Sequence, residues 1–281
     1  LAGQTSTRSL QCPEMPGRCT IRLAALQSTG WPVGIVYSQA EILAPLRQFQ
    51  LKTALIGGVT LLFTYSEAKL DYDQFAADGP IGKAKEYMGT YKEELDRTEK
   101  TYGVNGRVIT AILLVETRLG KYLGKRSTLN TLSTLASLMD PQTRSEFYHK
   151  IPKAKRISIK KFEKSARARS KWAYKELKAF LEYTEQEGLD PAEIPGSFAG
   201  AMGLSQFVHS SILNYGKDGN NDGSIDLLTH ADAIASIANY LKSHGWRPGI
   251  SREKAEKVIY HYNHSKYYVK AILKIADLLK S

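Results

Sequence analysis

The sequence has 281 residues, 42% of them hydrophobic and 24% charged, which is typical of a globular protein with a sizeable core. Lys and Arg outnumber Asp and Glu by 39 to 28, so the net charge is +11 and the isoelectric point is about 9.4. This balance favours a polyanionic partner. The basic residues are not interleaved with aromatic residues in one stripe, and no nucleic-acid-binding motif occurs, which argues against nucleic acid.

The first fifty residues carry no clear structural signal. Residues 1–50 lack an initiating Met and show no sustained amphipathic period, and we interpret them as non-native sequence upstream of a true start at Leu51. They contain Cys12 and Cys19, the two cysteines of the chain. From Lys69 onward neither a disulfide framework nor a Cys metal site is therefore available.

Residues 51–68 have the pattern of a secretory signal peptide. Lys52 precedes an apolar run over residues 53–65, and small residues stand at Ser66 and Ala68, after which cleavage is expected. The alternatives are a buried core element and a membrane anchor, for which this run is short, since a span needs about 20 residues. No Cys stands at the cleavage point. We therefore expect a periplasmic protein, residues 69–281, without a lipid anchor.

The rest of the chain is predicted to be mainly α-helical, because apolar residues recur at helical spacing and no strand pattern is sustained. The expected helices are 80–101, 105–119, 128–139, 170–187, 230–243, 251–261 and 266–279, and a short helix follows the Gly-rich stretch 196–203. Residues 150–169 are strongly basic. We interpret them as a solvated, mobile face in preference to a surface that holds an anionic glycan.

Glu116 is the candidate for acid–base chemistry. It follows Ile112 by four residues and Ile109 by seven, so it lies on an apolar face of the expected helix 105–119. Burial disfavours the charged form of a carboxyl group, so a proton is retained near neutrality, as donation to a glycosidic oxygen requires. The alternative is a structural ion pair with Arg118 or Lys121. The helical pattern alone does not decide between the two.

Four segments resemble the lytic murein transglycosylase B family, in the family's order. They are Val115-Glu-Thr-Arg-Leu-Gly120 with Leu132-Ser-Thr-Leu-Ala136, the stretch 196–207 (GSFAGAMGLSQF), the stretch 232–246 (DAIASIANYLKSHGW), and Tyr262-Asn-His-Ser-Lys-Tyr-Tyr268. Together they extend over most of residues 100–280. The resemblance implies a mainly α fold with a lysozyme-like catalytic domain over residues 69–281.

The resemblance also implies a reaction. The family cleaves the β-1,4 bond between N-acetylmuramic acid and N-acetylglucosamine in peptidoglycan without water, leaving a 1,6-anhydro end. Glu116 stands at the family's single catalytic position, as acid and then base, whereas most glycosidases use two carboxylates. We find no second carboxylate in a comparably apolar setting. No catalytic cofactor is implied.

The remaining site residues follow from the same resemblance. Ser197 and Gln206 match positions that contact substrate near the acid, and Tyr262 and Asn263 match the pair behind it. For Tyr268 we favour simple aromatic packing. The glycines at 196, 200 and 203 allow backbone to approach a sugar ring or the catalytic helix closely. One departure is Val208-His209-Ser210-Ser211, where the family commonly has Met-Pro-Ser-Ser, so the start of the next helix should differ.

Residues 218–226 have the oxygen spacing of the first part of an EF-hand calcium loop, with Gly223 at position 6. Position 12 is Thr229 instead of the usual Glu, and the resemblance assigns the missing ligand to Asp232. We expect a structural Ca²⁺, with Na⁺ as an alternative occupant and a metal-free turn as the alternative structure. The expected ligands, within an EF-hand-like loop at 218–232, are Asp218, Asn220, Asp222, Ser224 and Asp232.

Two other functions remain open at this stage, a hydrolytic muramidase and a non-catalytic peptidoglycan-binding protein. The expected partners are peptidoglycan glycan strands and proteins of cell-wall synthesis or remodelling, and the expected oligomeric state is a monomer. We expect no nucleic-acid partner. Endo or exo cleavage and the need for peptide stems do not follow from the sequence.

Overall fold

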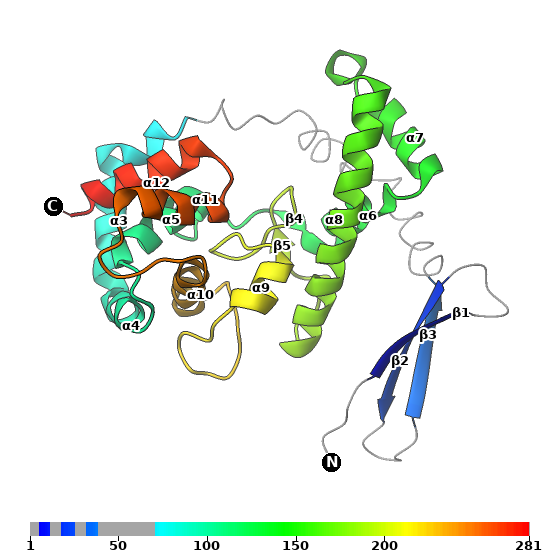
Figure 1. The fold of residues 1–281 in the computed structure, drawn as a ribbon, viewed down its shortest axis with the longest axis horizontal. Coiled ribbons are helices and arrows are strands. Elements are labelled where there is room, and N and C mark those ends of the chain that lie inside the picture. The colour runs from blue at the N-terminus through cyan, green and yellow to red at the C-terminus, as the bar shows by residue number, and fades with distance from the viewer. Residues whose placement is uncertain (1–5, 12–17, 26–31, 39–70, 281) are drawn as a thin grey trace.

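The computed structural model describes residues 6–11, 18–25, 32–38 and 71–280 (Figure 1). The predicted signal peptide at 51–68 lies outside these ranges. Three strands, β1 (Ser6–Gln11), β2 (Arg18–Ala25) and β3 (Pro32–Ser38), form an antiparallel sheet in the order β1-β2-β3. These strands were not predicted, because no period is sustained through residues 1–50, although apolar residues alternate locally from Cys19 to Ala25 in β2. That these residues lie upstream of the native start stays a prediction.

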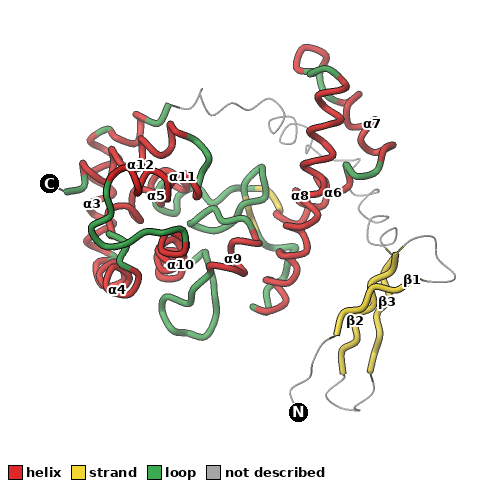
Figure 2. The backbone as a smooth tube through the Cα atoms, viewed as in Figure 1, coloured by secondary structure: helices red, strands yellow, loops and turns green. Residues whose placement is uncertain are grey.

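From residue 71 onward the regular secondary structure of the described chain is helical, apart from two short paired strands (Figure 2). The elements are η2 (Asp73–Ala76), α3 (Asp78–Thr90), α4 (Lys92–Tyr102), α5 (Gly106–Thr117), β4 (Arg126–Ser127), α6 (Thr128–Ser137), α7 (Pro141–Lys150), η3 (Lys153–Lys155), α8 (Ile159–Gln186), β5 (Pro195–Gly196), α9 (His209–Tyr215), α10 (His230–Ser243), α11 (Arg252–Tyr262) and α12 (Lys266–Leu278). The predicted fold class is confirmed as mainly α. Among the described residues, no helix is long and apolar enough to span a membrane.

The helices pack around two hydrophobic cores. The first lies between α3, α4, α5, α10, α11 and α12, with the buried α5 in contact with α12 (Figure 1). The second lies between α6, α7, α8 and α9. Tyr240 and Tyr262 pack against both cores. The segment 196–207 also joins them, since Leu204 is buried in the first core while Met202 and Phe207 are buried in the second. The boundary between the cores thus passes through this segment.

Three regions differ from the helices predicted above. The expected helix 80–101 breaks at Tyr91, whose ring lies 4.3 Å from that of His230. Helix α7 was not predicted, although Asp140 accepts a hydrogen bond from the Thr143 amide and Pro141 occupies the first helical position. The basic residues expected to be mobile belong largely to α8, a single helix of 28 residues.

Candidate active site

Glu116 lies near the end of α5 and is half-buried. The helix begins at an Asn105 cap and is held in the first core by fully buried residues such as Ile109 and Ile112. Directly after Glu116, Thr117 is buried, and its hydroxyl contacts the carbonyl oxygen of Leu113 at 3.3 Å and that of Leu204 at 3.2 Å. The end of the helix is therefore fixed to the segment 196–207.

The backbone after Glu116 adopts the left-handed conformation at three successive residues. The φ angles of Arg118, Leu119 and Gly120 are 51°, 61° and 91°. For non-glycine residues this conformation costs about 1–3 kcal/mol each and is often found at functional sites. Arg118 donates a hydrogen bond to Gln74 and lies over the Phe75 ring. Arg118 is thus directed toward η2. The alternative in which Arg118 pairs with Glu116 did not predict these contacts.

Tyr268 of α12 donates a hydrogen bond to Glu116 Oε1, with an oxygen–oxygen distance of 2.7 Å. The tyrosine is buried, and its ring stacks parallel to Tyr262 at 6.4 Å and meets Tyr72 edge-on at 6.2 Å. The expectation that Tyr268 serves only aromatic packing is therefore wrong. Ser265 caps α12 by accepting from the Tyr268 amide, which places the tyrosine in the first turn. The hydrogen bond fixes the orientation of the carboxyl group.

Tyr262 also lies close to Glu116. Burial raises the pKa of Tyr262 and of Tyr268 well above the usual value of 10.0, and the charge of Glu116 raises both further. Both hydroxyls therefore stay protonated at any working pH and remain donors. Tyr262 donates to the carbonyl oxygen of Ser205 at 2.5 Å. This bond ties α11 to the segment 196–207 one residue before Gln206.

The segment 196–207 forms a compact hairpin whose shape depends on backbone bonds. Met202 and Phe207 exchange two hydrogen bonds, and the Gln206 amide nitrogen Nε2 donates to the Gly203 carbonyl at 2.9 Å. Gln206 has a φ of 49°, an uncommon value for this residue type. Because Thr117 and Tyr262 bind the carbonyl oxygens of Leu204 and Ser205, the backbone directly before Gln206 lies beside the end of α5 and beside Tyr262.

Two of the three glycines in this hairpin have positive φ angles, and all three approach other segments closely. A Cβ at Gly196 would lie 2.4 Å from Thr128 Oγ1, one at Gly200 2.8 Å from Leu132, and one at Gly203 2.6 Å from Leu227. The expected close approach to the catalytic helix is not made by these glycines, which meet α6 and the segment before α10. It is Gly120, after α5, whose Cβ would meet Leu204 at 2.8 Å.

The other two predicted substrate residues lie at the edges of this site. The Ser197 hydroxyl accepts from the Ala199 and Ala201 amides, so it stabilises the hairpin turn. Asn263 follows Tyr262 as the C-cap of α11, and its backbone amide donates to the Ile259 carbonyl. The structure thus groups Glu116, Gln206 and Tyr262, with Asn263 adjacent and Ser197 at the far end of the hairpin. Their contact with substrate stays a prediction.

Two further carboxylates are more deeply buried than Glu116, which corrects the expectation that none is comparably placed. Glu176 of α8 is 2% exposed and accepts from the amide and the hydroxyl of Ser210. Asp232 of α10 is fully buried and accepts from the amides of Gly219 and Asp226. Both carboxylates therefore stabilise turns and helix starts, whereas Glu116 accepts its hydrogen bond from the hydroxyl of Tyr268.

His209 is the first residue of α9 and stands where the resembled family commonly has Pro. It is fully buried, meets the Phe180 ring edge-on at 4.7 Å, and neither ring nitrogen has a hydrogen-bond partner among the described residues. Burial lowers the pKa of His209 to about 3. Helix α9 begins at this position, and Val208 before it is extended, a conformation that Pro would also accept. The expected change in the helix start stays a prediction.

His209→Pro is expected to raise stability, most strongly in mild acid. In the unfolded chain His209 binds a proton near the ordinary histidine pKa of 6.5, and in the folded chain only near 3. Stability contributed by neutral His209 is therefore present above about pH 6.5 and falls by up to about 1.4 kcal/mol per pH unit between these values. The variant should lose this dependence and gain about 1 kcal/mol at pH 7. Urea unfolding at pH 7 and pH 5 measures both the gain in stability and its pH dependence. A gain in stability that is no larger at pH 5 than at pH 7 would contradict the prediction.

The acidic loop at 218–232 is held by its own carboxylates. Asp218 accepts from the amides of Asn221, Asp222 and Gly223, and these bonds lower its pKa. Asp232 closes the loop through Gly219 and Asp226 as above. The Ser224 hydroxyl donates to Glu187, the residue that follows α8, a contact that sequence spacing did not predict. Within the described residues, no three Asp, Glu, His or Cys side chains gather into a metal site, so the structure itself does not show the predicted EF-hand-like ligation.

A family model described as the transglycosylase SLT domain matches residues 38–256, which is more than half of the sequence, so the chain belongs to this family. The match includes Glu116 and Gln206 and ends before Tyr262. The resemblance noted from the sequence is thereby confirmed.

The chain is also similar to particular proteins. The membrane-bound lytic murein transglycosylase B of Escherichia coli K12 is 36% identical over 163 residues, which is 58% of this chain but only 38% of that protein. The soluble lytic transglycosylase SltB1 of Pseudomonas aeruginosa has the same fold, at a TM-score of 0.65 and 24% identity, covering 84% of this chain and 92% of that one.

Two similar structures were solved with ligands. Escherichia coli lytic transglycosylase Slt35, in complex with calcium, matches at a TM-score of 0.59 and 24% identity, covering 86% of this chain and 84% of that one. Pseudomonas aeruginosa SltB3, in complex with NAG-anhNAM-pentapeptide, matches at 0.62 and 18% identity, covering 86% and 79%. At these identities the similarity shows a common fold.

Proposed function

We propose that the chain is a peptidoglycan lytic transglycosylase with Glu116 as its acid and base. The observation that carries the proposal is the half-buried Glu116 carboxyl group, held by Tyr268 at 2.7 Å beside Tyr262 and the hairpin of Gln206. Family membership and the muropeptide bound by the similar SltB3 support the substrate class.

In the proposed reaction, Glu116 first donates its proton to the oxygen between N-acetylmuramic acid and N-acetylglucosamine. The substrate's own acetamido group stabilises the cation that forms at C1. Glu116, now ionised, then takes the proton from the muramyl O6 hydroxyl, which closes the 1,6-anhydro ring and restores the acid. Tyr268 donates to the carboxylate throughout, which orients it and stabilises the ionised stage. One carboxyl group is sufficient because donation and removal follow each other in time.

Gln206, Tyr262 and Asn263 are proposed to bind the glycan beside the acid, and Ser197 is proposed to bind it at the far end of the hairpin. The rigidity of the hairpin supports this, because substrate groups must be positioned to within about 0.5 Å. Release of soluble fragments from purified sacculi tests the function. A non-catalytic peptidoglycan-binding protein would bind the sacculi and release nothing.

A structural calcium ion in the loop 218–232 is proposed as well. The predicted donors at Asp218, Asn220, Asp222, Ser224 and Asp232 are all oxygen atoms, which suit Ca²⁺. The left-handed residues Asn221 (φ 62°) and Gly223 (φ 90°) give the loop the tight turn that such sites need. Calcium would join the end of α9 to the start of α10 and take no part in the reaction. The calcium bound by Slt35 supports the proposal.

Calcium is expected to raise the melting temperature by about 5 °C when the free calcium concentration is about a hundred times the dissociation constant of the site. Asp222→Ala should abolish the gain, because it removes a ligand without disturbing a buried group. Glu86→Ala, which removes an exposed acid from α3, should leave the gain intact. Differential scanning calorimetry with Ca²⁺ and Mg²⁺ makes the measurement, and equal shifts in both variants would assign calcium to other sites.

We also propose that the protein acts in the periplasm as a monomer on peptidoglycan strands, alongside cell-wall synthesis or remodelling proteins. The predicted signal peptide at 51–68 and the basic charge support the location and the substrate. Fractionation of cells that produce the full chain tests the location.

A further inference from the structure

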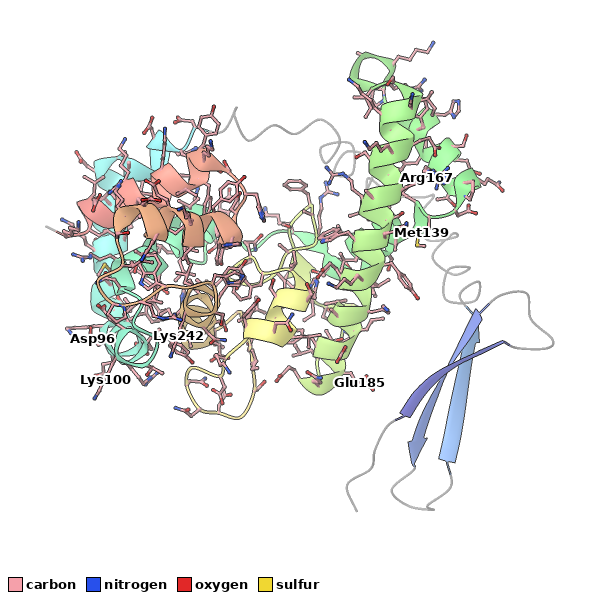
Figure 3. The ribbon with its side chains drawn as sticks, viewed as in Figure 1. Asp96, Lys100, Met139, Arg167, Glu185 and Lys242 are labelled. Atoms are coloured by element: carbon pink, nitrogen blue, oxygen red, sulfur yellow. The ribbon has the colours of Figure 1, made fainter. Side chains whose placement is uncertain are left out.

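Helix α8 carries six exposed basic residues in one line. They are Lys160, Lys164, Arg167, Lys171, Lys175 and Lys178, which we call the cationic row, and Figure 3 labels Arg167 near its middle. Successive members are three or four residues apart, so at 3.6 residues per turn they lie within an arc of about 80° and extend over about 27 Å. The row is thus a straight band of positive charge along the helix.

The opposite face of α8 is buried in the second core, through residues such as Phe162, Ala166 and Phe180. A solvated helix face usually mixes charges of both signs. Before Glu182, however, α8 has only two carboxylates. Glu163 is bound by Arg144 and Arg167, and Glu176 is buried against Ser210. Within the row, Arg167 is therefore paired with Glu163, and the first exposed carboxylate of α8 in line with the row is Glu182, one turn beyond Lys178.

This arrangement opposes the stability of the helix. Its first turn has no acidic residue and contains Lys160 and Lys161, while its last turn has no basic residue and contains Glu185. Both ends are thus charged against the helix dipole. Pairs such as Lys171 and Lys175 also place like charges one turn apart, where they repel. Solvation alone gives no reason for such an arrangement, whereas a bound polyanion would relieve the repulsion.

A linear polymer suits the row better than a bilayer. Helices that lie on membranes insert an apolar face beside their basic face, and the apolar face of α8 is occupied by the second core. Beside the row, Trp172 is 36% exposed and offers an aromatic ring of the kind that packs against sugars. Peptidoglycan combines sugar rings with peptide carboxylates at regular intervals.

We propose that the cationic row binds the peptide-stem carboxylates of a peptidoglycan strand, as a second contact outside the Glu116 site. The proposal rests on the proposed function for its substrate class. It makes the peptide stems part of what the protein recognises, and it predicts affinity that falls steeply with salt.

The test measures binding in the Glu116→Gln background, so that the strand stays intact. Sedimentation with purified peptidoglycan at low salt compares K164Q/K171Q/K175Q with a matched control, K100Q/K254Q/K270Q, which removes three exposed lysines from α4, α11 and α12. All six lysines are exposed, so both variants should fold. The row variant should bind about tenfold more weakly, with a smaller salt dependence, and the control should bind as the parent does. Peptidoglycan whose carboxyl groups have been coupled to methylamine should not distinguish the three proteins.

Three results would overturn the proposal: equal losses in the row variant and the control, an unchanged difference on methylamine-coupled peptidoglycan, or a larger loss on phosphatidylglycerol vesicles than on peptidoglycan. The last would assign the row to a membrane surface. Binding is measured here without turnover, so an inactive wild-type protein would refute the proposed function and leave this result standing.

Discussion

Glu116→Gln is expected to lower the release of soluble glycan fragments by about a thousandfold or more. Glutamine keeps the shape of the side chain and can still accept from Tyr268, but it can neither give nor take a proton. Loss of one general acid–base group typically costs about 10²–10⁴ in rate, and here one residue serves both steps. Initial rates on purified sacculi measure the effect, with pelleting to show that binding persists.

Glu176→Gln is the matched control for this variant. It makes the same substitution in a carboxylate that is more deeply buried but bound to Ser210. We expect it to lower the melting temperature, because the start of α9 loses a charged acceptor, and to keep most activity at 25 °C. If Glu116→Gln stayed within tenfold of wild type, the assignment of the acid would be wrong.

Tyr268→Phe is expected to lower activity about tenfold at neutral pH and to move the basic limb of the pH–rate profile to higher pH. The hydroxyl donates to Glu116 Oε1 and thereby favours the ionised carboxylate. Without it the protonated form, which the first step requires, persists to higher pH. A hydrogen bond to a charged group contributes about 1.5–3 kcal/mol, which corresponds to about 1–2 pH units.

Tyr183→Phe provides the comparison for Tyr268→Phe. Tyr183 is equally buried, and its hydroxyl donates to the Ile225 carbonyl at 2.7 Å in the second core. Loss of that bond should lower stability and leave the pH–rate profile where it was. A profile that moves in the Tyr183 variant, or stays fixed in the Tyr268 variant, would show that Tyr268 acts through packing alone.

The helix of Glu116 could be predicted from the sequence because its signals are local. Ile109, Ile112 and Glu116 share a face by spacing alone, and α10 was predicted with its observed bounds for the same reason. Helix α7 was missed although its signal was present, because Asp140 and Pro141, which begin it, stand directly after the expected helix 128–139 and are equally consistent with the end of a helix. In α8, apolar residues at helical spacing such as Phe162, Ala166 and Ala173 were obscured by the surrounding lysines.

The contacts of the site could not be predicted in this way. Whether Tyr262 of α11 or Tyr268 of α12 reaches Glu116 depends on how these two helices are positioned along α5. The spacing of residues within one helix does not encode that position. The burial of Glu176 likewise depends on where α9 meets α8. At the break in the helix, Tyr91 contacts His230, far along the chain. Local periodicity placed Glu116 on an apolar face of its helix, and tertiary packing determined its neighbours.

Digestion of purified peptidoglycan in ¹⁸O-labelled water, followed by mass spectrometry of the fragments, tests the central claim most directly. Wild-type protein should give muramyl ends that are one water molecule lighter than hydrolysis products and free of label, and the Glu116→Gln protein should give none. Labelled reducing ends from the wild type would show a hydrolase, and unlabelled anhydro ends from the Glu116→Gln protein would show that another group moves the proton.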